Sequence, residues 1–245
     1  MKDTFNTIKG NLYLRVNELR LIAILAVIGF VTGHTILRLV MEFDTSDDLT
    51  SFELGTVVTA MIMFVTAVTA GSNKYASNIN FAISMGKRRR DIITAHVAVA
   101  LVKSLLATSL IYAFHQLESY ICRTTYRDIP MEFNFDNIFT PKVFFVILLY
   151  LVAVETFMGS MMTRFGQKTF WILWLVCVLG FTSIPSVIEQ TIDGTANDIT
   201  ATIGQFFIDI LSGLTMEGML LGICGVCIIL IMLPYILLRK HSVAI

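Results

Sequence analysis

The chain has 245 residues, of which 56% are hydrophobic and only 15% are charged, and its mean hydropathy is +0.75. Its 18 basic and 18 acidic residues cancel, so the sequence lacks the excess of positive charge that nucleic-acid-binding proteins use, and we expect no nucleic-acid partner. This composition predicts a membrane protein.

The first 20 residues predict an amphipathic helix that lies in the membrane interface and leads into the first span. Apolar residues recur there at spacings of three and four, with charged residues on the other faces. The apolar positions are Phe5, Ile8, Leu12, Val16 and Leu19.

Six apolar segments follow, each near the roughly 20 residues that a helix needs to cross a bilayer. They are residues 21–41, 54–70, 92–117, 143–163, 170–188 and 216–238. Once these spans are subtracted, no soluble domain remains. We therefore expect one all-α, polytopic membrane domain over residues 1–245.

Basic residues gather on one side of the expected spans, which orients the chain. The densest run, between the second and third spans, is Lys87, Arg88, Arg89 and Arg90. Together with the two chain ends and the fourth loop, this side holds 13 of the 18 basic residues. Because positive loops stay in the cytoplasm, both termini are predicted to be cytoplasmic.

The loop before the third span, residues 71–90, predicts a short helix on the cytoplasmic face. Its apolar residues Tyr75, Ile79, Ala82 and Ile83 have helical spacing, and Gly86 follows as a stop signal. A short helix beside cations suits either docking of a soluble partner or anchoring to anionic lipid. Composition leaves both interpretations open.

The fifth loop predicts a second amphipathic helix, which is too short and too polar to span the membrane. Asn197 and Asp198 are candidate caps. The apolar positions after them are Ile199, Ile203, Phe206, Ile210 and Leu214. This helix is expected at the outer membrane boundary, whereas the third loop, residues 118–141, is expected to be irregular.

Two charged residues fall near the middle of predicted spans: Lys103 in the third and Glu155 in the fourth. A lone charge there costs roughly 2.5 to 3.5 kcal/mol on insertion scales. Counted from the inner ends, both lie at similar depths, which predicts a Lys103–Glu155 pair. A structural role between helices is favoured slightly over contact with substrate.

Other polar residues within the spans carry weaker signals. His34 and His115, near the outer ends, are interpreted as interfacial residues rather than ligands. Candidates for cavity lining are Thr56, Thr59, Thr66, Thr69, Ser104 and Thr108. Cys177, Cys224 and Cys227 lie at membrane depth, where packing is the expected role, and Cys122 is placed in an outer loop.

Sequence motifs for catalysis are missing, so we expect no enzyme activity. The chain has no G-x-x-x-x-G-K-[ST] phosphate loop, no H-E-x-x-H and no G-x-S-x-G. It is therefore expected to bind no metal or cofactor and not to hydrolyse ATP by itself.

The layout of spans, the amphipathic leader and the string Ser84-Met85-Gly86-Lys87-Arg88-Arg89-Arg90 resemble a type-2 permease of the ATP-binding-cassette (ABC) class. The string is similar to one that small exporters of Gram-positive bacteria carry before the third span. This resemblance implies a bacterial plasma membrane, amphiphilic substrates such as drugs or antimicrobial peptides, and a second permease copy or a related permease chain.

The resemblance also implies roles for two segments. Residues 73–85 would be the coupling helix, docked on a cytoplasmic ABC ATPase that binds the ATP and magnesium. Residues 192–214 would help to close the exit at the outer face. The coupling residues would be Tyr75, Ile79, Ala82, Ile83, Met85 and Gly86.

Two other functions stay open from the residues. One is a transporter driven by an ion gradient, with Glu155 as proton carrier and Lys103 as its counter-charge. The other is a non-transporting membrane scaffold or sensor that recruits a cytoplasmic partner through the basic loop.

Overall fold

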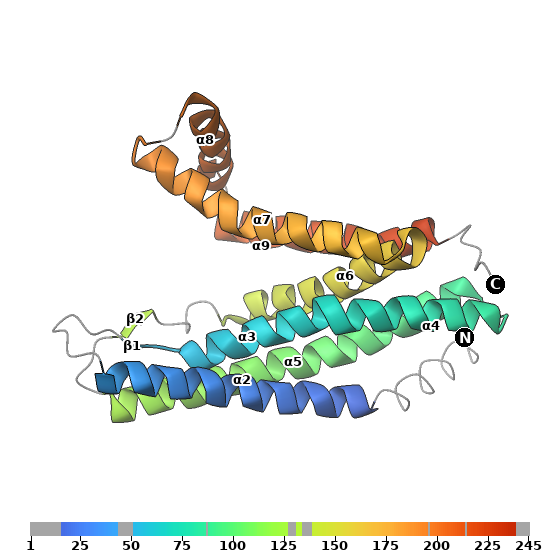
Figure 1. Ribbon diagram of the computed structural model, residues 1–245, viewed down its shortest axis with the longest axis horizontal. Coiled ribbons are helices and arrows are strands. Elements are labelled where there is room, and N and C mark those ends of the chain that lie inside the picture. Colours follow the sequence, from blue (N-terminus) through green and yellow to red (C-terminus); the bar gives the residue numbers. More distant parts are fainter. Residues whose placement is uncertain are drawn as a thin grey trace.

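The computed structural model describes residues 16–43, 51–86, 88–126, 131–133, 139–195, 197–213 and 215–238. These residues form helices and one short strand pair, which confirms the all-α prediction (Figure 1). In chain order the elements are α2 (Val16–Phe43), β1 (Ser51–Phe52), α3 (Leu54–Thr66), the π-helix η1 (Ala67–Gly71), α4 (Ser72–Ser84), α5 (Arg89–Thr125), β2 (Met131–Phe133), α6 (Pro141–Phe165), α7 (Gln167–Ile192), α8 (Asp198–Gly213) and α9 (Met216–Leu237).

Among the described residues, five helical stretches are long and apolar enough to cross a bilayer. They are Val16–Phe43, Leu54–Ser84, Arg89–Thr125, Pro141–Phe165 and Met216–Leu237. Each covers one of the predicted spans. The remaining predicted span, 170–188, lies in α7, which is not one of these five. The chain is thus a multi-pass membrane protein, and a sixth span stays a prediction.

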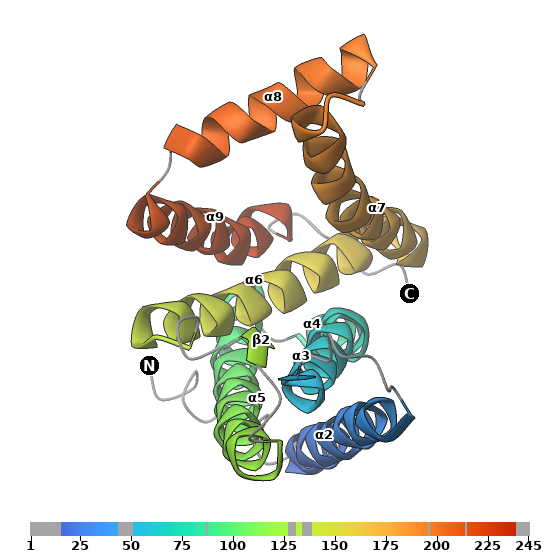
Figure 2. The ribbon, with the colours of Figure 1, turned by 90° about the vertical axis from the view of Figure 1, so that its left-hand side faces the viewer.

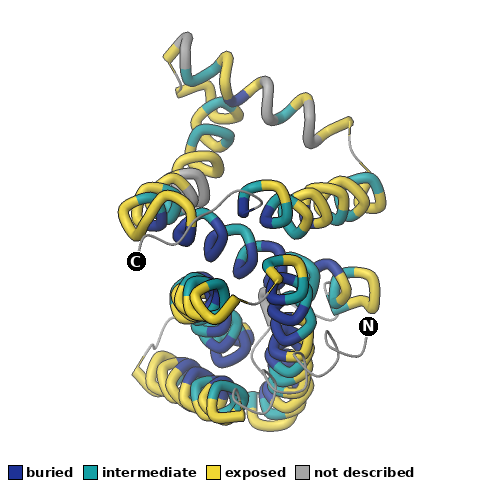
Figure 3. The backbone as a smooth tube through the Cα atoms, turned by 90° about the vertical axis from the view of Figure 1, so that its right-hand side faces the viewer, coloured by how far each residue is buried: buried dark blue, intermediate teal, exposed yellow. Residues whose placement is uncertain are grey.

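The long helices lie side by side, and α6 occupies the centre (Figure 2). On one side α6 packs against α4 and α5, and on the other against α7 and α9. Helix α2 completes the first group by packing on α3 and α5. Buried residues face this interior, whereas outward faces are exposed (Figure 3). Exposed apolar faces of this kind match contact with lipid.

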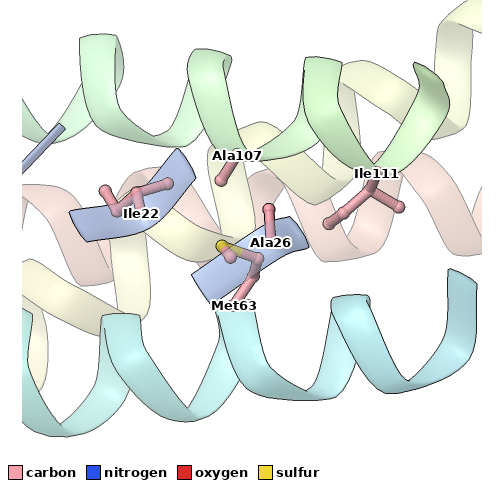
Figure 4. Packing of buried hydrophobic residues seen from close by; sticks show 5 residues of the cluster. All are labelled: Ile22, Ala26, Met63, Ala107 and Ile111. Atoms are coloured by element: carbon pink, nitrogen blue, oxygen red, sulfur yellow. The ribbon is translucent and has the colours of Figure 1, made fainter. Parts of the chain in front are cut away.

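Small residues let α2, α3 and α5 approach closely. Ala26 of α2, Ala107 of α5 and Met63 of α3 belong to one buried cluster (Figure 4). Towards the opposite end of α2, Gly33 lies against Gly55 of α3, where an added Cβ would be 2.7 Å from the Gly55 Cα. Close approach through small residues is a common way for membrane helices to pack.

The second span and the helix predicted in the following loop form one continuous helix, which differs from the expectation. Residues Leu54–Ser84 run through α3, η1 and α4 without a break. The junctions stay helical, with φ −62° and ψ −45° at Ala67 and φ −65° and ψ −41° at Ser72. The helix stops near the expected glycine, because Gly86 adopts a φ of 74°.

Two other predicted segments differ in part. Most of the expected leader, residues 1–20, lies outside the described residues, and its described part, from Val16, already belongs to α2. The third loop is shorter than expected, because α5 continues to Thr125 and includes the buried Cys122. Beyond it, β2 pairs with β1 in parallel.

Helix α8 occupies the position of the predicted outer amphipathic segment. Its start is capped, since Asn197 Oδ1 accepts a hydrogen bond from the Thr200 backbone N–H at 3.1 Å. Helix α8 packs on α7. The two come so close at Gly204 that an added Cβ would lie 1.9 Å from Thr191 Oγ1.

Candidate functional site

A buried ion pair joins α5 to α6. Lys103 Nζ lies 2.5 Å from Glu155 Oε1, and the two residues are 6% and 2% exposed. The structure therefore brings together the two residues that the sequence places at similar depths. Because neither charge is solvated by water, each depends on the other for compensation.

Two further residues extend this pair into a network. His96 Nε2 lies 3.1 Å from Glu155 Oε1, and His96 precedes Lys103 by two helical turns on the same face of α5. Glu18 of α2 approaches Lys103 Nζ at 3.8 Å and Lys74 Nζ at 3.9 Å. Two carboxylates thus face two ammonium groups, which balances the charge of the site.

Glycines allow the continuous helix to pack on α6 beside the network. A Cβ at Gly71, the last residue of η1, would lie 2.7 Å from Glu155 Cδ. One turn further along α6, a Cβ at Gly159 would lie 2.5 Å from Tyr75 Cβ. The Tyr75 ring in turn meets the His96 ring edge to face, with centroids 4.3 Å apart. Short π-helical segments often occur at functional sites, and this one adjoins the charged network.

A cavity of about 100 Å³, here called the charged cavity, lies beside the network. Its charged lining consists of Glu18, Lys74, Lys103 and Glu155. Most of its remaining wall is apolar and includes Leu21, Ile22, Met63, Ala107 and Leu151. A site with charges at one part and apolar walls elsewhere can hold an amphiphilic group.

Only part of the predicted polar lining faces this cavity. Thr66 and Ser104 line the cavity, whereas the other hydroxyl residues that were predicted as cavity lining do not. Thr59 donates to the Gly55 carbonyl at 2.8 Å, and Thr108 donates to the Ser104 carbonyl at 2.7 Å. Such bonds to the helix's own backbone satisfy a hydroxyl without any ligand.

The residues predicted to couple to an ATPase divide between an inner and an outer face of α4. Tyr75 and Ile79 are 0% and 2% exposed and pack with Ile92 and Leu238 in a buried cluster, so they form no docking surface, contrary to the expectation. The helix turns them towards α5, because it continues the register of the second span.

The outer face of α4 carries different side chains. Ala82 and Ile83 are half-buried, whereas Met85 and Gly86 are exposed. Phe81, which the sequence analysis did not single out, is 67% exposed, one turn before Met85 at 63%. The sequence does carry a signal for this surface: Phe81 stands four residues before Met85, a spacing that places two apolar side chains on one helix face.

The basic run begins α5 at one end of the molecule, here called the basic end. Arg88 and Arg90 are exposed and Arg89 is half-buried, while Lys87 lies outside the described residues. The start of α2 and the ends of α4, α6 and α9 lie at this same end (Figure 1). Which side of the membrane it faces stays a prediction.

A second polar cluster lies at the opposite end of the bundle. The Glu118 carboxylate accepts hydrogen bonds from the backbone N–H groups of Gly55 and Thr56 at 2.8 and 2.7 Å. His115 is hydrogen-bonded to Glu53, and both are 0% exposed. His115 is thus buried inside the bundle, and its depth in the membrane stays a prediction.

This cluster caps the first turn of α3. The first N–H groups of a helix have no partner within it. A carboxylate accepts hydrogen bonds from them, and its negative charge interacts favourably with the positive end of the helix dipole. His34 Nδ1 lies 3.7 Å from Glu118 Oε1, so α2 takes part as well. Sequence reasoning missed the cluster because it assigned Glu53 and Glu118 to loops.

Comparisons with known proteins leave the function to be argued from this geometry. No family model matches the chain, and the searches of curated proteins and of solved structures found no match. Within the described part of the chain, no group of three or more His, Cys, Asp or Glu residues could hold a metal ion. The fold and the site define a multi-pass helical membrane protein with a charged cavity inside its bundle.

Proposed function

We propose that this chain is the membrane-spanning permease subunit of an ABC exporter, which moves an amphiphilic substrate across a bacterial plasma membrane. The observation that most supports this proposal is the continuous helix Leu54–Ser84. Its middle lines the charged cavity, and its last turns expose an apolar surface at the basic end. One continuous helix thus connects the proposed substrate site with the proposed docking site.

The docking surface of this proposal consists of Phe81 and Met85. Both are exposed by about two thirds, at 67% and 63%, and they lie one turn apart on α4. Arg88 and Arg90 follow closely and are exposed as well. Large apolar side chains beside cations at the end of a membrane helix suit a soluble protein partner. That partner would be the ATPase, which would carry the ATP and magnesium.

The charged cavity suits the substrate class. Its apolar wall would accept the hydrophobic part of a drug or antimicrobial peptide, and the compensated charges would meet a polar group. A movement of α4 driven by the ATPase would shift η1 against Glu155, because Gly71 touches that side chain. Transport requires that the two resulting states bind substrate differently. A second permease copy or a related chain would complete the pathway.

Co-purification tests the proposal. The chain is expressed with its genomic neighbours, isolated in mild detergent, and the eluate is assayed for ATP hydrolysis. Wild type should retain an ATPase subunit, and the double variant Phe81→Asp with Met85→Asp should lose it. Ser77→Asp, an exposed change on the same helix, is the matched control and should retain the ATPase. Absence of an ATPase with wild type, or its retention by the double variant, would overturn the proposal.

A second function is favoured by the buried Lys103–Glu155–His96 network. Buried carboxylates with cationic partners occur in proton-coupled transporters, so an ion gradient could drive transport without an ATPase. The purified chain, reconstituted alone in liposomes, distinguishes the two. Transport driven by a pH gradient and abolished by Glu155→Gln would support this second function, and its absence would exclude it.

A further inference from the structure

A larger cavity lies at the basic end, between the first turns of α5 and the last turns of α9. Its volume is about 610 Å³. Its lining residues are Arg89, Arg90, Ile93, Thr94, Met232, Tyr235 and Leu238. None of these residues lines the charged cavity, so this pocket, here called the basic pocket, is a separate feature.

The polar part of the basic pocket has the chemistry of a phosphate site. Arg89 and Arg90 supply two guanidinium groups, which bind phosphate oxygens through paired N–H donors. Thr94 Oγ1 and Tyr235 OH, from the two helices, lie 3.1 Å apart in a hydrogen bond, and Thr94 Oγ1 also donates to the Arg90 carbonyl at 2.9 Å. None of the described lining residues is acidic. An anion entering the pocket would therefore meet two cationic side chains and no acidic side chain from this described lining.

The remaining wall is apolar and extends along α9 away from the basic end. Met232 precedes Tyr235 by nearly one turn of α9, on the side away from the basic end, and is 58% exposed. Ile93 and Leu238 close the inner wall and are 2% and 1% exposed. Donors near the end of the helices and an open apolar wall further in match the order of headgroup and acyl chain in a phospholipid.

We propose that the basic pocket binds an anionic phospholipid. Its phosphate would lie against Arg89 and Arg90, and one acyl chain would run along Met232. Basic pockets between membrane helices are known to take acidic headgroups. The lipid would bridge α5 and α9, which meet directly over only a short stretch. This inference does not depend on the exporter proposal.

The test uses the full-length chain in detergent and native mass spectrometry with added lipid. Phosphatidylglycerol should bind to wild type in preference to phosphatidylcholine. Arg90→Gln should weaken phosphatidylglycerol binding by about fivefold, the effect of one cationic side chain near a membrane surface. Arg88→Gln, an exposed change two residues away and outside the pocket, removes the same charge and should leave binding unchanged.

Further arms separate the alternatives. Arg90→Lys, which keeps the charge without the paired donors, should recover part of the loss and shows that a folded variant was measured. Bound phosphatidylglycerol that resists millimolar inorganic phosphate supports a lipid site. Equal binding of the two lipids, or equal losses in Arg88→Gln and Arg90→Gln, would overturn the proposal. Arg90-dependent binding of inorganic phosphate without lipid preference would overturn it in favour of a soluble anion.

Discussion

Single residues in this protein are most constrained where charge is buried. Lys103 and Glu155 lie 2.5 Å apart with almost no exposure, so removal of one leaves the other uncompensated. His96 lies beside Glu155 but does not replace Lys103, because a neutral imidazole brings no positive charge to compensate the carboxylate. Breaking the pair is therefore expected to be costly, because it leaves an uncompensated buried charge.

Replacement of Lys103 should destabilise the fold strongly. Lys103→Met is expected to lower the free energy of unfolding by about 3 kcal/mol, since a buried carboxylate loses its partner. The measurement is denaturant unfolding in detergent. Lys74→Met is the matched control, because its pair with Glu18 is 3.9 Å long and the lysine is 59% exposed, so its loss should cost less than about 1 kcal/mol.

The charge-swapped double variant, Lys103→Glu with Glu155→Lys, should recover much of the loss caused by either reversal alone. Equal effects of the Lys103 and Lys74 variants would contradict the view that burial makes this pair important.

Glycine positions give a second prediction at this scale. Gly33→Ala should destabilise the bundle by about 1 to 3 kcal/mol, because its Cβ would lie 2.7 Å from backbone atoms of Leu54 and Gly55. Gly222→Ala should have no such cost, because nothing lies within 4 Å of its Cβ. Thermal unfolding of the two variants checks this. A large loss in Gly222→Ala would point to a contact with another chain.

The sequence contained enough information for the Lys103–Glu155 pair but not for its surroundings. Counting residues from the inner ends of two spans gives depth, and depth was sufficient to match these two. The periodicity of residues 1–20 placed Glu18 on a polar face of the interfacial helix. Its contact with Lys103 was missed, because the angle of α2 against α5 depends on the packing of both helices. Glu53 and His115 were likewise missed, because their contact depends on how far α5 continues past the apolar segment.

At the level of elements, hydropathy located the helices better than their ends. Ser72, Asn73 and Lys74 end the apolar stretch, yet the backbone continues as helix through them. A fall in hydropathy marks where lipid contact ends, whereas a helix ends where its backbone bonds are terminated, as at Gly86. The continuation turns Tyr75 and Ile79 inward, which composition alone does not reveal.

The two faces of α4 should respond differently to the same substitution. Ile79→Asp is expected to reduce the free energy of unfolding by roughly 3 kcal/mol or more, since it places an unpaired carboxylate in a buried cluster. Phe81→Asp should change it by less than about 1 kcal/mol, because Phe81 is 67% exposed. Unfolding of the isolated chain gives both values. Similar losses would mean that Phe81 also packs inside the fold.

Across the whole molecule, basic residues mark one end and the buried carboxylate cluster marks the other. Ser84 ends α4 shortly before α5 begins, and Thr125 is the last residue of α5, whose 37 residues extend over about 55 Å. This length exceeds the roughly 30 Å of a hydrocarbon core, so the two residues should lie on opposite sides of the membrane.

Cysteine labelling in intact cells tests this orientation. In a chain without its native cysteines, Thr125→Cys should react with a membrane-impermeant maleimide. Ser84→Cys should react only after permeabilisation, because the positive-inside tendency places the basic end in the cytoplasm. The reverse pattern would invert the assigned topology, and labelling of both in intact cells would contradict the spanning of α5.

Because the helix Leu54–Ser84 is continuous, a force applied at one end is expected to reach the other end. Three hydrogen bonds from Gly55 and Thr56 to Glu118 hold one end of the helix, so the helix is expected to pivot there. At a constant rise per residue, a lateral push at Phe81 moves Gly71 by roughly three fifths as much. A displacement of a few ångströms at the exposed end would therefore move Gly71 against the Glu155 side chain on which it packs. Weakening the hydrogen bonds to Glu118 should therefore reduce the coupling between Phe81 and Gly71 without changing either residue.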